Sequence, residues 1–239
     1  MKNMKTLVMR ISFFEAFFKV HYTKTSRITY PIPLPTSVAG MFGGMLGLSR
    51  KEASKYFADC VFGACVDPAK KISENRENAT YILFSKLKQP NRGKGVETIS
   101  IINEPTYLIA IGGDEEKIAE IREQLMKGIS YLPFGGQNDF FVKDWSFVGN
   151  FEIMADEYVS NYVPTMWVGE ISKDTTFQIL PVNHNLPDID RNFTFILNGS
   201  VKLKKEWVNK INTVEVEGKH IALYPLHKFV VVGEWGIQE

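Results

Sequence analysis

The neighbouring residues His21, Tyr22 and Lys24 carry the groups that a metal-independent ribonuclease uses. A histidine acts as a general base toward a ribose 2′-hydroxyl, and a lysine stabilises the charge that develops on the phosphate. In an extended segment, however, the side chains of His21 and Tyr22 would point to opposite faces. A single histidine among aromatic residues more often stacks on a base or packs locally. We therefore predict a protein that is not an enzyme, with a metal-independent endoribonuclease as the alternative.

No other cluster of residues predicts catalysis, a metal site or a cofactor. The acidic residues Asp114–Glu116 suit a helix N-terminus, and Asp188 and Asp190 stand in a turn without a histidine at metal-ligand spacing. The paired glycines of the chain lack the spacing of phosphate-binding loops. Cys60 and Cys65 have no second pair and no nearby histidine, which predicts two buried thiols.

Aromatic and basic residues are interleaved near the N-terminus, in a mixture typical of single-stranded RNA binding, where rings stack on bases and cations contact phosphates. The aromatic residues are Phe13, Phe14, Phe17, Phe18, Tyr22 and Tyr30. The basic residues among them are Arg10, Lys19, His21, Lys24 and Arg27. At least half of the phenylalanines are expected to belong to the core. The basic residues and Tyr30 are therefore candidate RNA contacts.

A proline-rich arm leads into a glycine-rich helix between residues 29 and 48. The arm carries Pro31, Pro33 and Pro35, and the helix carries Gly40, Gly43, Gly44 and Gly47. The prolines keep the arm extended, so the helix is expected to begin at Thr36, with Thr36 or Ser37 as its cap. Each glycine costs about 1 kcal/mol relative to alanine inside a helix. Their density therefore indicates close approach, either by a packed strand or by a phosphate at the helix N-terminus. Ser49 and Glu52 then form a capping box for a further helical segment.

Two further segments are candidates for RNA contact. The residues between the predicted strands Thr80–Leu87 and Val96–Ile102 form a basic hairpin tip. Its cations are Lys86, Lys88, Arg92 and Lys94. The other segment, residues 131–139, is a glycine loop whose candidate contacts are Gly135, Gly136, Gln137 and Asn138.

The net charge of +1 conceals an uneven distribution along the chain. Residues 1–98 contain 16 Lys and Arg against 7 Asp and Glu, whereas residues 99–239 contain 12 against 20. A basic half favours a polyanion, and an acidic half suits either a basic protein neighbour or solvent. No apolar run is long enough to span a membrane and the N-terminus lacks the pattern of a secretion signal, which predicts a cytoplasmic protein without membrane contact.

The hydrophobic patterns predict an α+β fold. In residues 1–148 the order is strand, helix, strand, hairpin insertion, strand, helix, strand, with a half-buried first strand at Lys5–Ser12 and a clear helix at Asp114–Lys127. This is the βαββαβ arrangement of a ferredoxin-like or RRM-like domain, with the hairpin at about 80–102. Residues 149–239 show short strand patterns separated by turn residues, which predicts a smaller, mostly β domain.

The arm, the first helix and the glycine loop together resemble the CRISPR-associated protein family five, the crRNA-capping subunit of type I Cascade complexes in the RAMP superfamily. The matching positions are Arg27, Tyr30, Pro31, Pro33, Pro35, Thr36, Ser37, Gly40, Gly43, Gly44 and Gly47, followed by Tyr131–Asp139. The resemblance covers residues 1 to about 145. Many relatives carry a basic residue where this chain has Gln137.

This resemblance implies a non-catalytic RNA-binding subunit that caps the 5′ handle of a crRNA for antiviral defence. Its implied protein partners are a backbone subunit and the large subunit of the effector complex, and no cofactor is implied. The arm would hold Arg27 and Tyr30 against the handle, the helix N-terminus would face a phosphate, and the glycine loop would let a base or phosphate approach the main chain. The basic hairpin is similar to the family's thumb. One subtype of the family cleaves precursor RNA with a tyrosine, lysine and histidine set that has no residue-by-residue match here.

Overall fold

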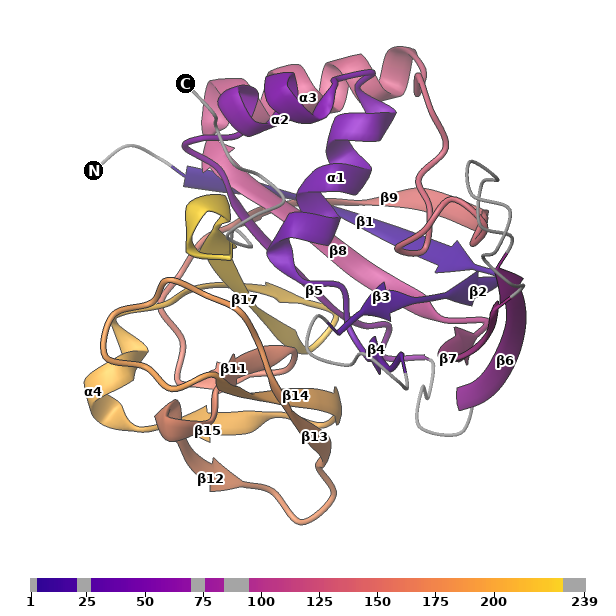
Figure 1. Ribbon diagram of the computed structural model, residues 1–239. Coiled ribbons are helices and arrows are strands. Elements are labelled where there is room, and N and C mark those ends of the chain that lie inside the picture. The colour runs from indigo at the N-terminus through magenta and orange to yellow at the C-terminus, as the bar shows by residue number, and fades with distance from the viewer. Residues whose placement is uncertain (1–3, 21–26, 70–75, 84–94, 230–239) are drawn as a thin grey trace.

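The structure is a computed structural model that describes residues 4–20, 27–69, 76–83 and 95–229. Strands predominate over helices in these residues, which confirms the α+β class (Figure 1). The largest sheet has six antiparallel strands in the order β16-β17-β5-β8-β1-β9. Its strands are β1 (Met4–Phe13), β5 (Val61–Val66), β8 (Thr106–Asp114), β9 (Val142–Glu152), β16 (Asn212–Val216) and β17 (Lys219–Pro225).

Helices lie on one face of this sheet (Figure 1). Along the chain they connect one strand of the sheet to the next, in the order that the sequence predicts. They are α1 (Pro35–Met45) and α2 (Arg50–Tyr56), which connect β1 to β5, and α3 (Glu115–Lys127), which connects β8 to β9. Successive side chains of β1 point to opposite faces of the sheet, so each face buries a different set of residues. Leu7, Met9 and Ile11 join the core cluster that contains Ile118 of α3, whereas Val8 belongs to a separate cluster on the opposite face.

The first helix begins one residue earlier than predicted. Pro35 is its first residue and Leu34 its N-cap, with no side-chain hydrogen bond at the cap, so the expectation that Thr36 or Ser37 caps the helix is wrong. The physical reason is that proline suits the first helical position, because its fixed φ is already helical and its missing N–H would have no partner there. The capping box of α2 is confirmed. The Ser49 N–H donates to Glu52 Oε2 at 2.8 Å, and the Glu52 N–H donates to Ser49 Oγ at 3.4 Å.

The C-terminal part is mostly β, as predicted, and contains two small sheets. One consists of β10 (Tyr158–Val159), β15 (Val201–Leu203) and β12 (Val168–Ile171), and the other of β11 (Tyr162–Pro164), β14 (Asn192–Asn198) and β13 (Thr176–Pro181). A short helix, α4 (Lys205–Val208), follows β15.

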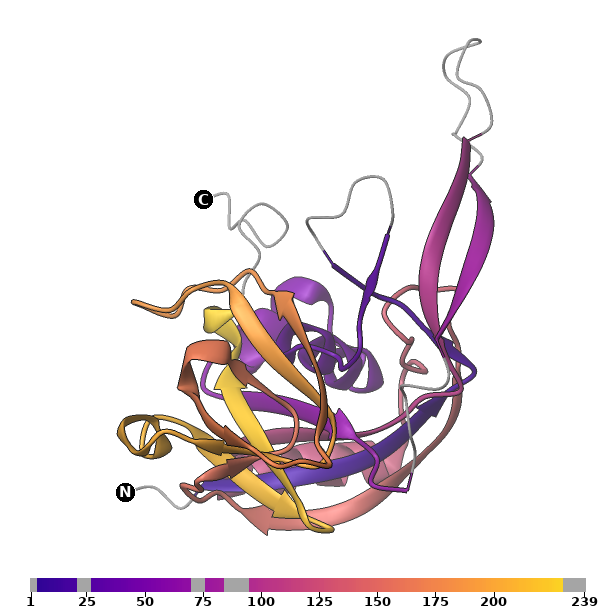
Figure 2. The same cartoon turned by 90° about the horizontal axis from the view of Figure 1, so that it is seen from below.

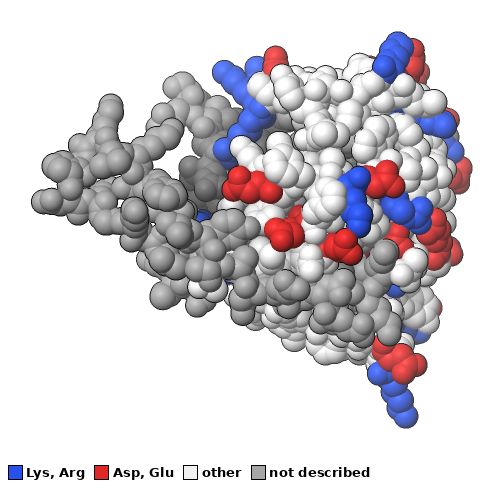
Figure 3. All heavy atoms as spheres, turned by 90° about the vertical axis from the view of Figure 1, so that its right-hand side faces the viewer, with Lys and Arg blue, Asp and Glu red and all other residues white. Residues whose placement is uncertain are grey.

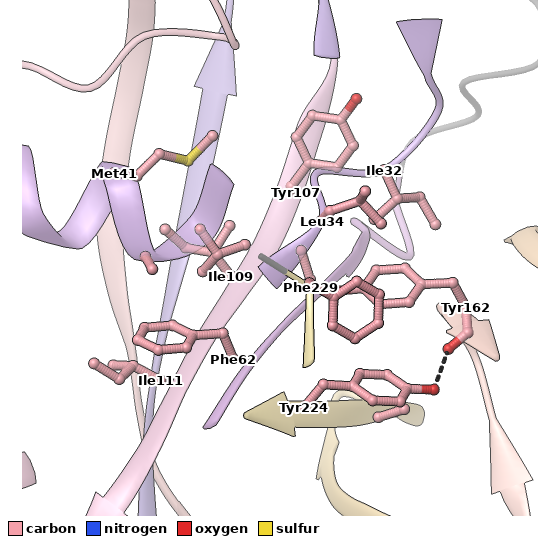
Figure 4. Close-up of a cluster of buried hydrophobic side chains, with 14 of the residues drawn as sticks. Ile32, Leu34, Met41, Phe62, Tyr107, Ile109, Ile111, Tyr162, Tyr224 and Phe229 are labelled. Atoms are coloured by element: carbon pink, nitrogen blue, oxygen red, sulfur yellow. Dashed lines mark hydrogen bonds between the residues drawn. The ribbon is translucent and has the colours of Figure 1, made fainter. Parts of the chain in front are cut away.

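The two parts of the chain share a sheet and a core. The predicted boundary after residue 148 falls inside β9, which continues to Glu152. β16 and β17 return to the six-stranded sheet, where Tyr224 pairs with Phe62 of β5. Figure 4 shows aromatic side chains of both parts in one buried cluster, with the Tyr224 hydroxyl donating to the Tyr162 carbonyl oxygen at 3.0 Å. The boundary at 148 therefore does not coincide with a break in packing.

The predicted hairpin is present and extends from the body of the molecule (Figure 2). Its strands β6 (Arg76–Leu83) and β7 (Gly95–Asn103) form a sheet with β2 (Glu15–Ala16), in the order β2-β7-β6. A separate strand pair, β3 (Phe18–Lys19) with β4 (Thr29–Tyr30), leads into the proline arm. Among the residues described, no helix combines the length and apolar character needed to cross a membrane.

Candidate nucleic-acid interface

A hollow of about 440 Å³, here called the trough, runs along the exposed side of α1 beside the glycine loop. Its lining comes from both segments and consists of Thr36, Ser37, Gly40, Met41, Gly44, Tyr131, Leu132, Pro133, Phe134, Gly136 and Asn138. Thr36, Gly40 and Gly44 are four residues apart and therefore lie on one helix face. The structure thus brings together two sequence motifs that are far apart in the chain.

The glycines of α1 divide into two groups with different surroundings. A Cβ placed on Gly40 or Gly44 would have no atom within 4 Å, so these two glycines form an open floor for the trough. A Cβ on Gly43 would lie 3.1 Å from the Cβ of Ala53 in α2, which makes Gly43 a close-packing residue. The assignment of Gly43 to RNA contact is therefore corrected, because α2 covers it.

The glycine loop is held tightly against the chain's own backbone. A Cβ on Gly135 would lie 2.7 Å from the Glu15 carbonyl oxygen, and a Cβ on Gly136 would lie 2.1 Å from the Phe17 carbonyl oxygen. The amide N–H of Gly135 donates to the Phe140 carbonyl oxygen at 2.7 Å, and that of Gly136 donates to the Phe134 carbonyl oxygen at 2.8 Å. These glycines thus permit the approach of residues 15–17. Gly135 is buried by this contact, which corrects its assignment to RNA contact, whereas Gly136 is exposed and lines the trough.

Few backbone donors remain at the start of α1. Pro35 has no N–H, and the N–H groups of Ser37 and Val38 donate to the Leu34 carbonyl oxygen at 2.9 and 3.0 Å. Thr36 stands in the first turn, where an amide has no acceptor within the helix. The N-terminal end of the trough therefore offers hydroxyl groups and a single first-turn amide.

Arg10 lies on the other face of the sheet. Its Nη2 contacts Glu217 Oε2 at 2.6 Å and its Nε contacts Asp67 Oδ2 at 2.5 Å. These hydrogen bonds, first to Glu217 and then to Asp67, raise the pKa of the guanidinium. Because Arg10 alternates with Met9 and Ile11, which pack on the helical side, its side chain is directed away from the trough. The structure therefore does not bring Arg10 to the candidate interface.

Tyr30 is a core residue. Its side chain is 2% exposed, its hydroxyl donates to the Pro181 carbonyl oxygen at 2.9 Å, and its ring stacks on Phe195 with centroids 5.5 Å apart. The interpretation of Tyr30 as an RNA contact is corrected, because no face of the ring is open to a base.

Three other predicted RNA contacts, Lys19, Arg27 and Gln137, are not among the residues that line the trough. Lys19 is exposed on β3. Arg27 is half-buried beside β7, where its carbonyl oxygen accepts from the Ser100 N–H at 2.8 Å. Gln137 is also half-buried, and its carbonyl oxygen accepts from the Phe140 N–H at 3.1 Å. The remaining candidates, His21, Lys24, Lys86, Lys88, Arg92 and Lys94, lie outside the described residues.

Two exposed aromatic side chains, Tyr131 and Phe134, line the trough, and sequence reasoning did not single out either as an RNA contact. Phe14 is 54% exposed, as single-stranded RNA contact would require, whereas Phe13, Phe17 and Phe18 are buried. Tyr131, Phe134 and Phe141 are also exposed. Their position on either side of the paired glycines was the signal that could have identified them.

The described charged residues on one side of the molecule do not form a single basic area. On the side of the molecule shown in Figure 3, cationic and anionic side chains of the described residues are intermixed. The basic character of residues 1–98 therefore does not translate into one basic face there. Within the described ranges, no three His, Cys, Asp or Glu side chains gather as a metal site requires.

No family model matches the chain, and no curated protein sequence matches it. Several solved structures are similar at low identity. A chain of a CRISPR RNA-guided surveillance complex is 16% identical over 84% of this chain and 92% of its own, with a TM-score of 0.48. A CRISPR-associated protein is 14% identical over 85% and 94%, with a TM-score of 0.40. A chain of the Type III-B Cmr-beta complex bound to cognate target RNA and AMPPNP is 13% identical over 83% and 86%, with a TM-score of 0.41. These scores are too low to establish a shared fold, so the function is argued from this chain's own residues.

Proposed function

We propose that this chain is a non-catalytic RNA-binding subunit of a type I CRISPR effector complex, in which it caps the 5′ handle of a crRNA. One observation carries the proposal. The glycine-rich helix and the glycine loop, which are the two segments that resemble family five, line a single trough of about 440 Å³. Exposed aromatic residues border this trough, and stacking on aromatic side chains is a common mode of single-stranded RNA recognition.

The order of the first strands supports the ferredoxin-like assignment of the N-terminal part. Two strand–helix–strand units place their strands in the order β5-β8-β1-β9, and the β6–β7 hairpin is inserted between them. The two central strands are β8 and β1, and each comes from a different unit, as in a βαββαβ fold. In the proposal, the hairpin is the thumb and contacts a backbone subunit, the large subunit is a further partner, and the complex acts in antiviral defence in the cytoplasm.

The absence of catalysis is part of the proposal. No Asp, Glu, His, Lys or Arg is among the described residues that line the trough. General acid–base cleavage of RNA needs groups that exchange protons near neutral pH, of which histidine is the commonest, and the described lining contains no histidine. The alternative is an endoribonuclease centred on His21, which lies outside the described residues.

Filter binding to two RNAs of equal length and charge tests the proposal. One is transcribed from the CRISPR repeat of the genome that encodes this chain, and the other has the same handle nucleotides in scrambled order. The repeat RNA should bind at least about tenfold more tightly, because hydrogen bonds to the edge of one correct base discriminate against a wrong base by about that much. Gly44→Leu should remove the preference by filling the trough, whereas Ala119→Leu on the exposed side of α3 should keep it.

Two results would contradict this function. Equal affinity of the wild-type chain for both RNAs, both weakening alike with salt, would leave only non-specific phosphate binding. Cleavage of labelled repeat RNA in a metal chelator, abolished by His21→Ala, would establish the endoribonuclease in place of the capping subunit.

A further inference from the structure

The trough is an unsuitable site for a phosphate. Phosphate groups in proteins are bound by arginine or lysine side chains, or by several backbone amides that converge on them. Among the described residues that line the trough, none is a lysine, an arginine or a histidine. Within the described lining, the sequence-based expectation of a phosphate at this helix therefore finds no cation to support it.

The backbone does not replace the missing cation. The amides of Gly135 and Gly136 are already donated to Phe140 and Phe134, and those of Ser37 and Val38 are donated to Leu34. At the start of α1 this leaves the first-turn amide of Thr36, which has no acceptor within its own helix. The helix N-terminus therefore presents one amide to the trough and not the converging set that holds an anion.

The shape and chemistry of the trough suit a flat, uncharged ring. Gly40 and Gly44 present bare helix backbone as its floor, with open space where a Cβ would stand. Leu132, Pro133 and Phe134 supply an apolar wall from the glycine loop. A base that leaves the RNA stack needs such a surface for one of its faces.

Polar groups occur where a base would need them. Thr36 and Ser37 contribute hydroxyls from the start of α1, and Asn138 contributes an amide from the end of the glycine loop. Hydroxyl and amide groups both donate and accept hydrogen bonds, so they can pair with the mixed donors and acceptors on a base edge. None of the three is charged.

We propose that the trough holds one unstacked RNA base, whose edge meets Thr36, Ser37 and Asn138, while the adjoining phosphates stay outside in solvent. This inference rests on the proposed function and deepens it. It replaces recognition of the handle through phosphate and main chain, at this site, by recognition of a base through side chains and a bare helix surface.

Two series of modified repeat RNAs test the inference. In the first, each handle position in turn is made abasic, which removes the base and keeps the phosphate. In the second, each phosphate in turn is replaced by a neutral methylphosphonate. One abasic position should weaken binding to the wild-type chain by about ten- to a hundredfold, the loss expected for one stacked base. The neutral linkages on either side of it should weaken binding by much less.

Trough variants then show whether that base lies in the trough. In Gly40→Val the abasic RNA and the unmodified RNA should bind equally, because the valine already excludes the base. Ala119→Val, which adds the same side chain to the exposed face of α3, should keep the full abasic loss. Gly40→Ala, which favours the helix, provides a folded variant with a partial effect if Gly40→Val unfolds.

The outcomes separate the inference from the function on which it rests. If the repeat RNA binds in preference to the scrambled RNA but every abasic loss persists in Gly40→Val and Gly40→Ala, the base lies elsewhere and the inference is wrong. If instead a neutral linkage weakens binding to the wild-type chain and this loss of affinity disappears in the Gly40 variants, the trough holds a phosphate. If the repeat RNA shows no preference at all, the proposed function fails and the inference with it.

Discussion

Neighbouring residues of α1 have unlike roles, because one helix face meets protein and another meets the trough. Gly43 faces Ala53 and Phe57, with its hypothetical Cβ 3.1 Å from Ala53 Cβ and 3.7 Å from Phe57 Cε2. Gly44 faces open space. The sequence offered a packed strand or a phosphate as alternative explanations of the glycine density, whereas in the structure Gly43 packs on α2 and Gly44 faces the trough.

Valine substitution separates these two roles by stability. Gly43→Val should lower the free energy of unfolding by about 1–3 kcal/mol, because the added methyl groups overpack the contact with α2. Gly44→Val should leave stability unchanged or raise it by a few tenths of a kcal/mol, since valine is the better helix former. Urea unfolding followed by circular dichroism measures both. Equal destabilisation would mean that something covers Gly44 as well.

Removal of the Tyr30 hydroxyl tests its assignment to the core. Tyr30→Phe should destabilise the protein by about 0.5–1.5 kcal/mol, because a partly buried hydrogen bond to the Pro181 carbonyl oxygen is lost. Affinity for the repeat RNA should not change. Unchanged stability with weakened RNA binding would return Tyr30 to the interface.

The two cysteines should be unreactive in the folded protein. Both are free and buried, as predicted, and burial raises the pKa of Cys60 to about 11 and that of Cys65 to about 12. Alkylation requires the thiolate, so iodoacetamide at pH 8 should modify neither residue in the native state and both in urea. The pKa values of both thiols in the folded protein lie above the ordinary thiol value of 9.0. Their contribution to stability is therefore full below pH 9 and is lost as the pH rises through the folded pKa values. Rapid native labelling at pH 8, read by mass spectrometry, would contradict this burial.

At the scale of elements, the position of the glycine loop depends on a glycine with a positive φ. Gly136 has a φ of 99° and lies against the backbone of Phe17, while the Phe17 N–H donates to the Gly135 carbonyl oxygen at 2.7 Å. These contacts fix one wall of the trough to the segment that follows β1.

Alanine at Gly136 should release this wall. Positive φ alone costs about 1–2 kcal/mol for a residue with a Cβ, and the clash with the Phe17 carbonyl adds to that cost. Gly218→Ala is the matched control, because Gly218 has a φ of 73° but nothing within 4 Å of its hypothetical Cβ. Gly136→Ala should therefore destabilise more than Gly218→Ala and should speed hydrogen exchange at the Phe17 amide. Similar stability and exchange in the two variants would show that the loop is not held by this contact.

Local patterns predicted the elements, whereas packing across the chain decided the site. The alternation around Leu7 and the capping box of Ser49 and Glu52 depend on near neighbours, so the sequence was sufficient for them. The role of Tyr30 depends on Pro181 and Phe195, which no local pattern connects to it. The trough required knowing that residues 131–138 return beside α1, and the two segments were recognised separately as candidates. Their meeting could not be derived from either one.

At the scale of the whole molecule, the C-terminal strands complete the N-terminal sheet. β17 pairs with β5, and a Cβ on Gly63 of β5 would lie 2.4 Å from the Ala222 carbonyl oxygen, so the contact is close. Arg10 of β1 adds a second connection, because it joins Asp67 beyond β5 to Glu217 in the turn between β16 and β17. The C-terminal hairpin is therefore attached to the same sheet that supports α1.

Loss of the Arg10 side chain should loosen this attachment. The Asp67 side chain is 4% exposed, so Arg10→Met would leave a nearly buried carboxylate without its cation. Removing one partner of a fully buried pair costs about 3–5 kcal/mol, and solvent screening of a guanidinium that is 34% exposed reduces the expected loss to about 1–3 kcal/mol.

A second pair on the same strand provides the control for Arg10. Lys5 of β1 contacts Glu152, whose side chain is 75% exposed, so Lys5→Met should lower stability much less than Arg10→Met. Urea unfolding of Arg10→Met, Glu217→Gln and the double variant gives the coupling energy between Arg10 and the hairpin turn. A positive coupling, with faster hydrogen exchange in β16 and β17 of Arg10→Met alone, is the expected result. Equal losses for Arg10→Met and Lys5→Met, with no coupling to Glu217, would mean that strand pairing and the shared core hold the C-terminal hairpin without help from Arg10.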